Sequence, residues 1–155
     1  MAAADEQFAA AIVRADRWLR TANVATVLDA SAVVLGLDRG ADGVATAQRT
    51  KALDTIRRGQ AQSGGWGPYV TAAPEVFDTA LALLALNGVR QSKLGAAIIS
   101  PADLDAMIAR WRTFLLSQQV ADGSWPETTR PANQESYAQR ISTTGWALLA
   151  LIETR

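Results

Sequence analysis

In the middle of the chain the sequence reads Asp78-Thr-Ala-Leu-Ala-Leu-Leu-Ala-Leu86, and two other stretches repeat its pattern. They are Asp29-Ala-Ser-Ala-Val-Val-Leu-Gly-Leu37 and Thr143-Thr-Gly-Trp-Ala-Leu-Leu-Ala-Leu151. Leucines occupy the seventh and ninth positions of all three stretches, and a small residue occupies the third. Each stretch is apolar almost all round, which is typical of a helix that neighbours cover on every side. Self-similarity of this kind indicates a repeat protein.

Amphipathic helices are expected between the apolar ones. Residues 5–21 place apolar side chains three and four positions apart, at Phe8, Ile12, Ala15 and Leu19. Residues 44–58 read as a second amphipathic helix and residues 100–118 as a third. The third begins with Ser100 as N-cap and Pro101 at the first helical position. These helices would each keep one face in water.

The apolar helices are expected at residues 24–37, 75–87 and 139–153, with Gly88 ending the second of them. Three covered and three half-covered helices predict an all-α fold of three helix hairpins, with an inner and an outer layer. The expected repeats cover about residues 5–38, 43–88 and 100–154 of a single domain, residues 1–155.

The connectors repeat as well. Phe114-Leu-Leu-Ser-Gln-Gln119-Val-Ala-Asp122-Gly123-Ser-Trp125 aligns with Gln60-Ala-Gln-Ser-Gly64-Gly65-Trp66. Glycine allows a sharp turn, tryptophan can cover a hairpin junction, and glutamine can bond unpaired backbone groups at helix ends. We therefore expect structural roles for Gln60, Gly64, Trp66, Gln119, Gly123 and Trp125.

Both connectors resemble the QW motif of squalene–hopene cyclases, in the α/α-toroid superfamily of terpenoid cyclases and protein prenyltransferases. The resemblance covers about residues 15–155. It implies hairpins arranged in a ring around a central cavity, with QW segments tying one hairpin to the next.

Because the family's ring usually has about twice as many hairpins, three hairpins would form an open arc. Either a second copy, in a homodimer, or an N-terminal portion of a longer ring could close it. The two ends of the open arc would expose apolar side chains, and an exposed apolar patch favours association. The side chains expected there are Val33, Leu37, Leu148 and Ile152.

In hopene-type cyclases the middle Asp of a D-x-D-D-T-A motif protonates the substrate. In the matching frame this chain has Glu75-Val-Phe77-Asp78-Thr-Ala80, with Phe77 in the place of the donor. A phenyl ring cannot supply a proton, so the family's mechanism does not carry over. Asp78 and Glu75 remain as candidate acids. Each is either a residue favoured by the free amides of a helix start, or an acid whose pKa is raised by burial.

Four aromatic side chains fall in loops and near the starts of apolar helices, namely Tyr69, Phe77, Tyr137 and Trp146. They could line a pocket for an apolar, isoprenoid-like molecule, or they could serve core packing and loop cover. The sequence thus favours a non-catalytic ligand-binding or structural module. A cyclase-like lyase or isomerase and a protein-interaction scaffold are the alternatives.

The composition excludes several classes of protein. The chain has no cysteine and no histidine, which excludes thiolate nucleophiles, imidazole metal sites and the zinc-dependent prenyltransferase branch. We expect no cofactor and no metal. Fifteen basic residues balance fifteen acidic ones without a basic stripe, so a nucleic-acid partner is not expected. No apolar stretch is long enough for a transmembrane segment, and residues 1–6 lack signal-peptide features. The expectation is a soluble protein, cytoplasmic by default.

Overall fold

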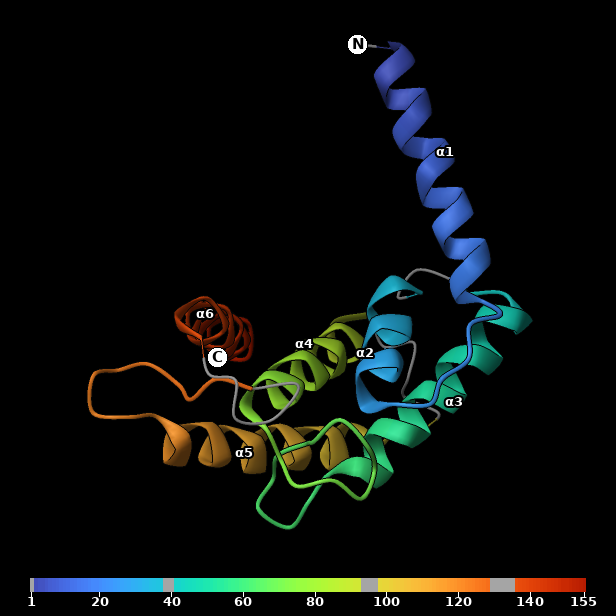
Figure 1. The fold of residues 1–155 in the computed structure, drawn as a ribbon. Coiled ribbons are helices and arrows are strands. Elements are labelled where there is room, and N and C mark those ends of the chain that lie inside the picture. Colours follow the sequence, from blue (N-terminus) through green and yellow to red (C-terminus); the bar gives the residue numbers. More distant parts are fainter. Residues whose placement is uncertain (1, 38–40, 93–97, 129–135) are drawn as a thin grey trace.

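A computed structural model describes residues 2–37, 41–92, 98–128 and 136–155. These residues form six helices and no strand (Figure 1). The helices are α1 (Ala2–Leu19), α2 (Val27–Gly36), α3 (Gly43–Gly59), α4 (Val76–Ser92), α5 (Pro101–Gln118) and α6 (Tyr137–Glu153). The predicted all-α fold is confirmed. Residue 38, the expected end of the first repeat, lies outside the described residues.

The helices form an inner and an outer row (Figure 1). α2, α4 and α6 pack in that order, with α4 in the centre of the inner row. In the outer row α3 packs against α2, and α5 packs against α4. An inner helix therefore pairs closely with the outer helix that follows it in the chain. The repeat boundaries expected from the sequence remain a prediction, because an array of this kind can be divided on either side of an inner helix.

Side-chain caps fix the starts of four helices, one of which is α6, where the hydroxyl of Ser136 accepts from the amide of Gln139 (3.2 Å). Thr26 and Asp29 form a capping box at α2, in which the Thr26 hydroxyl accepts from the Asp29 amide (2.9 Å) and the Asp29 carboxylate accepts from the Thr26 amide (2.8 Å). Asp42 accepts from the first amides of α3. At α5 the hydroxyl of Ser100 accepts from the amide of Asp103 (3.1 Å), and proline occupies the first turn as predicted.

The predicted helix end at Gly88 is wrong, because α4 continues through Gly88 to Ser92. Val89 in the extra turn is buried in the core. Burying a valine stabilises by about 1.5–3 kcal/mol, whereas a glycine inside a helix costs about 1 kcal/mol. The side chain of Arg90 also donates to Asn87 Oδ1 (2.8 Å) in this turn. Packing therefore outweighs the local preference of glycine.

The exposed ends of the array differ partly from those predicted. Val33 and Leu37 were expected on the surface but are buried, because α3 packs along α2 and Arg49 donates to the carbonyl of Leu37 (2.8 Å). Leu148 and Ile152 are exposed, as predicted. One side of α6 packs on α4, and its other side is open in the described part of the chain.

The first helix departs most from expectation. α1 projects away from the other five helices and makes only slight contact with α2 (Figure 1). Phe8 and Ile12, expected on the covered face of an outer helix, are exposed. The amphipathic pattern correctly predicted a helix, but in the described part of the chain only Leu19 of its apolar face packs beside an inner helix, α2.

Candidate functional site

The loop between α3 and α4, residues 60–75, carries the first QW segment and is called the first QW loop. It closes on itself through two backbone bonds, from the Ala61 amide to the Gly65 carbonyl (3.0 Å) and from the Gly64 amide to the Ala61 carbonyl (2.9 Å). The Gln60 side chain donates to the Gly64 carbonyl (2.9 Å). Gly64 has φ 96°, in the left-handed region that favours glycine. The glycine and the glutamine thus shape one tight turn.

Trp66 links this loop to both neighbouring helices. Its indole N–H donates to the carbonyl of Ile56 in α3 (2.7 Å), and the whole side chain is buried. Its backbone amide donates to the Thr79 hydroxyl in α4 (2.8 Å), and that hydroxyl donates to the Trp66 carbonyl (3.0 Å). The indole of Trp111 in α5 donates to the carbonyl of Thr79 (3.1 Å). Three helices therefore meet at this loop.

The loop after α5 carries the second QW segment, described here as residues 119–128, the second QW loop. It repeats these contacts. The indole N–H of Trp125 donates to the carbonyl of Leu115 (2.8 Å), and its amide donates to the Thr144 hydroxyl in α6 (3.1 Å). Gln119 donates to the carbonyl of Gly123 (2.9 Å), and Gly123 has φ 87°. Donors and acceptors therefore occupy matching positions in the two loops.

Sequence reasoning missed the two threonines. Thr79 and Thr144 both stand at the second position of the repeated apolar stretch. Their shared position in the aligned repeats was the one feature of the sequence that could have indicated a common role. A threonine within an apolar helix otherwise gives no indication that it bonds the backbone of a preceding loop.

An ion pair also fastens the second QW loop to α6. Arg140 Nη2 donates to Asp122 Oδ2 (2.9 Å), and Arg140 Nε donates to the Ser124 hydroxyl (2.8 Å). The Ser124 hydroxyl and amide donate to Asp122 Oδ1 (2.7 and 3.0 Å) and, together with the charge of Arg140, lower the pKa of Asp122. Asp122 therefore stays ionised and holds the loop in place.

The two candidate acids lie in different surroundings. Asp78 is the third residue of α4 and is fully buried. Glu75 is half-buried just before α4, where its carbonyl accepts from the Thr79 amide (3.0 Å). Glu75 also lines an open pocket of about 270 Å³, together with Pro74, Val76, Gln118, Pro126, Glu127 and Thr128. Asp78 is not among the residues lining this pocket.

The four candidate aromatics are dispersed. Phe77 is half-buried and lines a pocket of about 220 Å³ with Thr128, Gln139, Ser142 and Thr143. Tyr137 lines a different open pocket of about 420 Å³, beside Arg140 and Ile141. Tyr69 and Trp146 are exposed and line neither of these two pockets.

Among the described residues, no three acidic side chains come together in a way that could hold a metal ion. Within the same part of the chain, no helix has the length and hydropathy needed to cross a bilayer.

One segment of the chain is similar to lanosterol synthase of Mus musculus. The identity is 41% over 54 residues, which is 32% of this chain and 7% of the synthase. The matched segment therefore spans a small part of that relative, and the similarity to a terpenoid cyclase is distant. No protein-family model matches the chain, and no solved structure matches it.

Proposed function

We propose that this chain is a non-catalytic structural module built from terpenoid-cyclase-like helical repeats, in which the two QW loops fasten outer helices to inner helices. The observation that supports this role is the matching set of hydrogen bonds in the two loops. Trp66 and Trp125 are both buried, and both indole N–H groups donate to a carbonyl of the preceding outer helix. Aromatic surface and donors used in this way are not available to a ligand.

The surroundings of the candidate acids also favour a non-catalytic role. Cyclisation of a polyene requires a proton donor beside an enclosed apolar cavity, and Phe77 has no proton to donate. Glu75 lines an open pocket that also contains Glu127 and Gln118. An open polar pocket admits water, which quenches carbocations and increases the cost of holding a reactive charge.

Binding of an isoprenoid-like molecule is less well supported than a structural role. The pocket beside Phe77 is small, at about 220 Å³. The larger pocket beside Tyr137, at about 420 Å³, is open and is also lined by the charged side chains of Asp122 and Arg140. Ligand sites for apolar molecules are mostly apolar and occupy about 300–1,000 Å³. Of the two non-catalytic roles, we therefore propose the structural one.

A direct test is to incubate the purified chain with squalene and with geranylgeranyl diphosphate, alongside an active cyclase as positive control. We expect no cyclised product from this chain. Cyclised product from the unaltered chain that is lost in Glu75→Gln or Asp78→Asn, with the helical circular dichroism spectrum retained, would overturn the proposal and identify the acid.

A further inference from the structure

The first QW loop binds an outer helix in addition to fastening its own hairpin. Gln60 Nε2 donates to the carbonyl of Met107 in α5 (3.1 Å), and Gln60 Oε1 accepts from Arg110 Nη2 (2.6 Å). Gly64 lies so close to α5 that a Cβ atom there would come within 2.4 Å of the Arg110 carbonyl oxygen. The loop is therefore shaped to receive an outer helix, and α5 occupies that place.

The second QW loop presents the corresponding groups on the surface. Gln119 and Gly123 keep their internal bond but are exposed. A Cβ atom at Gly123 would meet no described atom within 4 Å, in contrast to Gly64. No described residue fills, on the second QW loop, the place that α5 fills on the first.

The inner helix beside this open place is uncovered along one side. Aligning α4 with α6 pairs four buried positions with four exposed ones. The pairs are Val76 with Ile141, Ala80 with Gly145, Leu83 with Leu148, and Asn87 with Ile152. Leu83 is 0% exposed, whereas Leu148 is 51% exposed. We call Ile141, Gly145, Leu148 and Ile152 the open stripe of α6.

α1 has the side chains of an outer helix, but among the described residues only Leu19, at its C-terminal end, packs beside an inner helix, α2. Four of its apolar residues have the spacing of four of the six buried residues of α5, and the smaller Ala11 and Ala15 stand where α5 has Met107 and Trp111. Phe8, Ile12, Trp18 and Leu19 correspond to Leu104, Ile108, Phe114 and Leu115, and Arg14 corresponds to Arg110. Leu104 and Ile108 are each 4% exposed, whereas Phe8 is 68% and Ile12 is 69% exposed.

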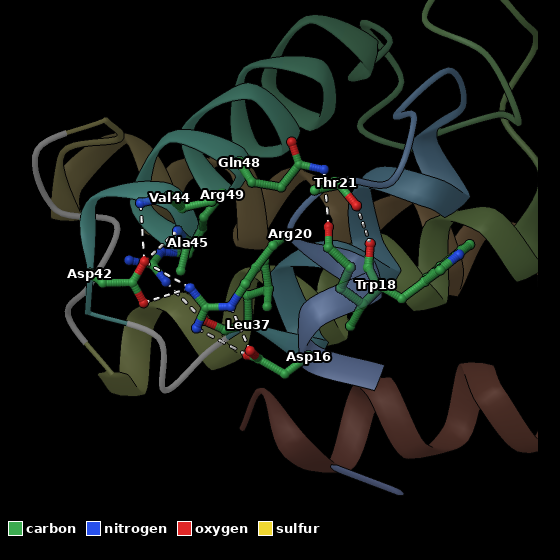
Figure 2. Close-up of polar contacts among 11 residues, drawn as sticks. Asp16, Trp18, Arg20, Thr21, Leu37, Asp42, Val44, Ala45, Gln48 and Arg49 are labelled. Carbon is green, nitrogen blue, oxygen red and sulfur yellow. Dashed lines mark hydrogen bonds and ion pairs between the residues drawn. The ribbon is translucent and has the colours of Figure 1, made fainter. Parts of the chain in front are cut away.

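The end of α1 nearest the body is held in place, as Figure 2 shows. Arg20 pairs with Asp16 of α1 and with Asp42 at the start of α3. Gln48 of α3 donates to the carbonyl of Leu19 (3.1 Å). These contacts form the α1 clamp, and the rest of α1 projects from it with its apolar face open (Figure 1).

We propose that α1 of one copy docks as an outer helix on the second QW loop and the open stripe of α6 of another copy. Phe8 and Ile12 then cover the stripe, and Arg14 donates to Gln119 Oε1 as Arg110 donates to Gln60. On the first loop, Phe114 packs so close to Gly65 that a Cβ atom there would lie 2.8 Å from its ring. The second loop has Ser124 at this position, so Trp18 lies slightly farther from the second loop than Phe114 does from the first.

Each copy offers one α1 and one open stripe. Two copies related by a two-fold axis use both pairs and form a closed dimer, whereas a rotation that does not close produces a chain of copies. The contact depends on the fold alone and holds for a catalytic and a non-catalytic protein alike.

Sedimentation equilibrium of the full chain over a concentration series tests the proposal. The mass should rise from 16.5 kDa towards twice that value. Ile12→Asp and Leu148→Asp should each remain monomeric where the unaltered chain is dimeric. Ala10→Asp, the same change on the other side of α1, should dimerise normally. Because Ala10, Ile12 and Leu148 are all exposed, circular dichroism should show unchanged helix content.

Mixing the two monomeric variants tests the pairing itself. Ile12→Asp retains an intact α6 stripe and Leu148→Asp retains an intact α1, so an equimolar mixture should associate through one of the two contacts. A monomer at every concentration would overturn the proposal. So would a dimer sensitive to Leu148→Asp but not to Ile12→Asp, which would indicate pairing between α6 helices.

Cross-linking provides an independent measurement. The chain has no cysteine, so Arg14→Cys and Gln119→Cys each introduce a unique thiol. A short bis-maleimide should join an Arg14→Cys chain to a Gln119→Cys chain several-fold more often than it joins two chains of either variant. Equal yields for all three pairings would contradict the head-to-tail contact.

Discussion

At the scale of single residues, comparing substitutions at the two left-handed glycines distinguishes the cost of backbone strain from the cost of disturbing the contact with α5. Changing Gly64 (φ 96°) or Gly123 (φ 87°) to alanine should lower the free energy of unfolding by about 1–2 kcal/mol, because a Cβ atom is unfavourable in the left-handed region. At Gly64 the new Cβ also collides with the backbone of Arg110, so overpacking should cost about 1–3 kcal/mol more. Urea unfolding of both variants at low protein concentration measures the difference. Equal losses would mean that the contact between the first QW loop and α5 contributes nothing to stability.

At the scale of elements, the α1 clamp should respond to acid. Arg20 donates to both oxygens of Asp42 (2.7 and 2.6 Å), and these bonds, with amide donors at the start of α3, lower the pKa of Asp42 from 3.8 to about 2. The pKa in the folded protein lies below that in the unfolded chain. The stabilisation is therefore complete above about pH 4 and is lost as the pH falls through the folded pKa. A carbon-13 titration of the Asp42 carboxyl should show a midpoint of about 2.

The matched variant for the clamp is Arg20→Gln, which removes the charged donor but leaves the amide donors of α3. It should move the Asp42 midpoint back towards 3.8 and increase amide exchange in the last turn of α1. A midpoint near 3.8 in the unaltered chain would show that Arg20 does not hold Asp42 in solution.

At the scale of the whole molecule, stability should not depend on a metal ion. The chain lacks histidine and cysteine, and the described acidic side chains form no cluster suited to a metal. Dialysis against a chelator should leave the melting temperature unchanged, because removal of a structural metal would remove its binding free energy from folding. A fall of several degrees that zinc or calcium reverses would contradict this expectation.

Much of the fold could be predicted from the sequence, because helix type depends on local pattern. Alternating amphipathic and apolar segments predicted six helices in two layers. The pattern shows which face of a helix is apolar but not which neighbour covers it. For that reason Val33 and Leu37 were wrongly placed on the surface, while the exposure of Phe8 and Ile12 was missed.

The candidate site was harder to predict, because it depends on where long loops lead. The glycine, glutamine and tryptophan positions could be found by alignment. Thr79 and Thr144 could not be assigned a partner, since each bonds a tryptophan 13 or 19 residues away across a loop. Phe77 and Tyr137 line different pockets. The sequence could not predict this, because spacing along the chain does not determine which side of the array a loop covers.

The order of the inner row also has a consequence for cooperativity. In a linear array, the stability of each unit comes from its own contacts and those with its nearest neighbours, so local opening is least frequent in the middle. α4 packs against α2, α5 and α6, whereas α1 touches the rest of the molecule only near its C-terminal end, through slight contact with α2 and hydrogen bonds to α3. Amide hydrogen exchange in the monomer should therefore be slowest in α4, faster in α6 and fastest in the first turns of α1. The molecule would open from its two ends towards the centre rather than in a single step.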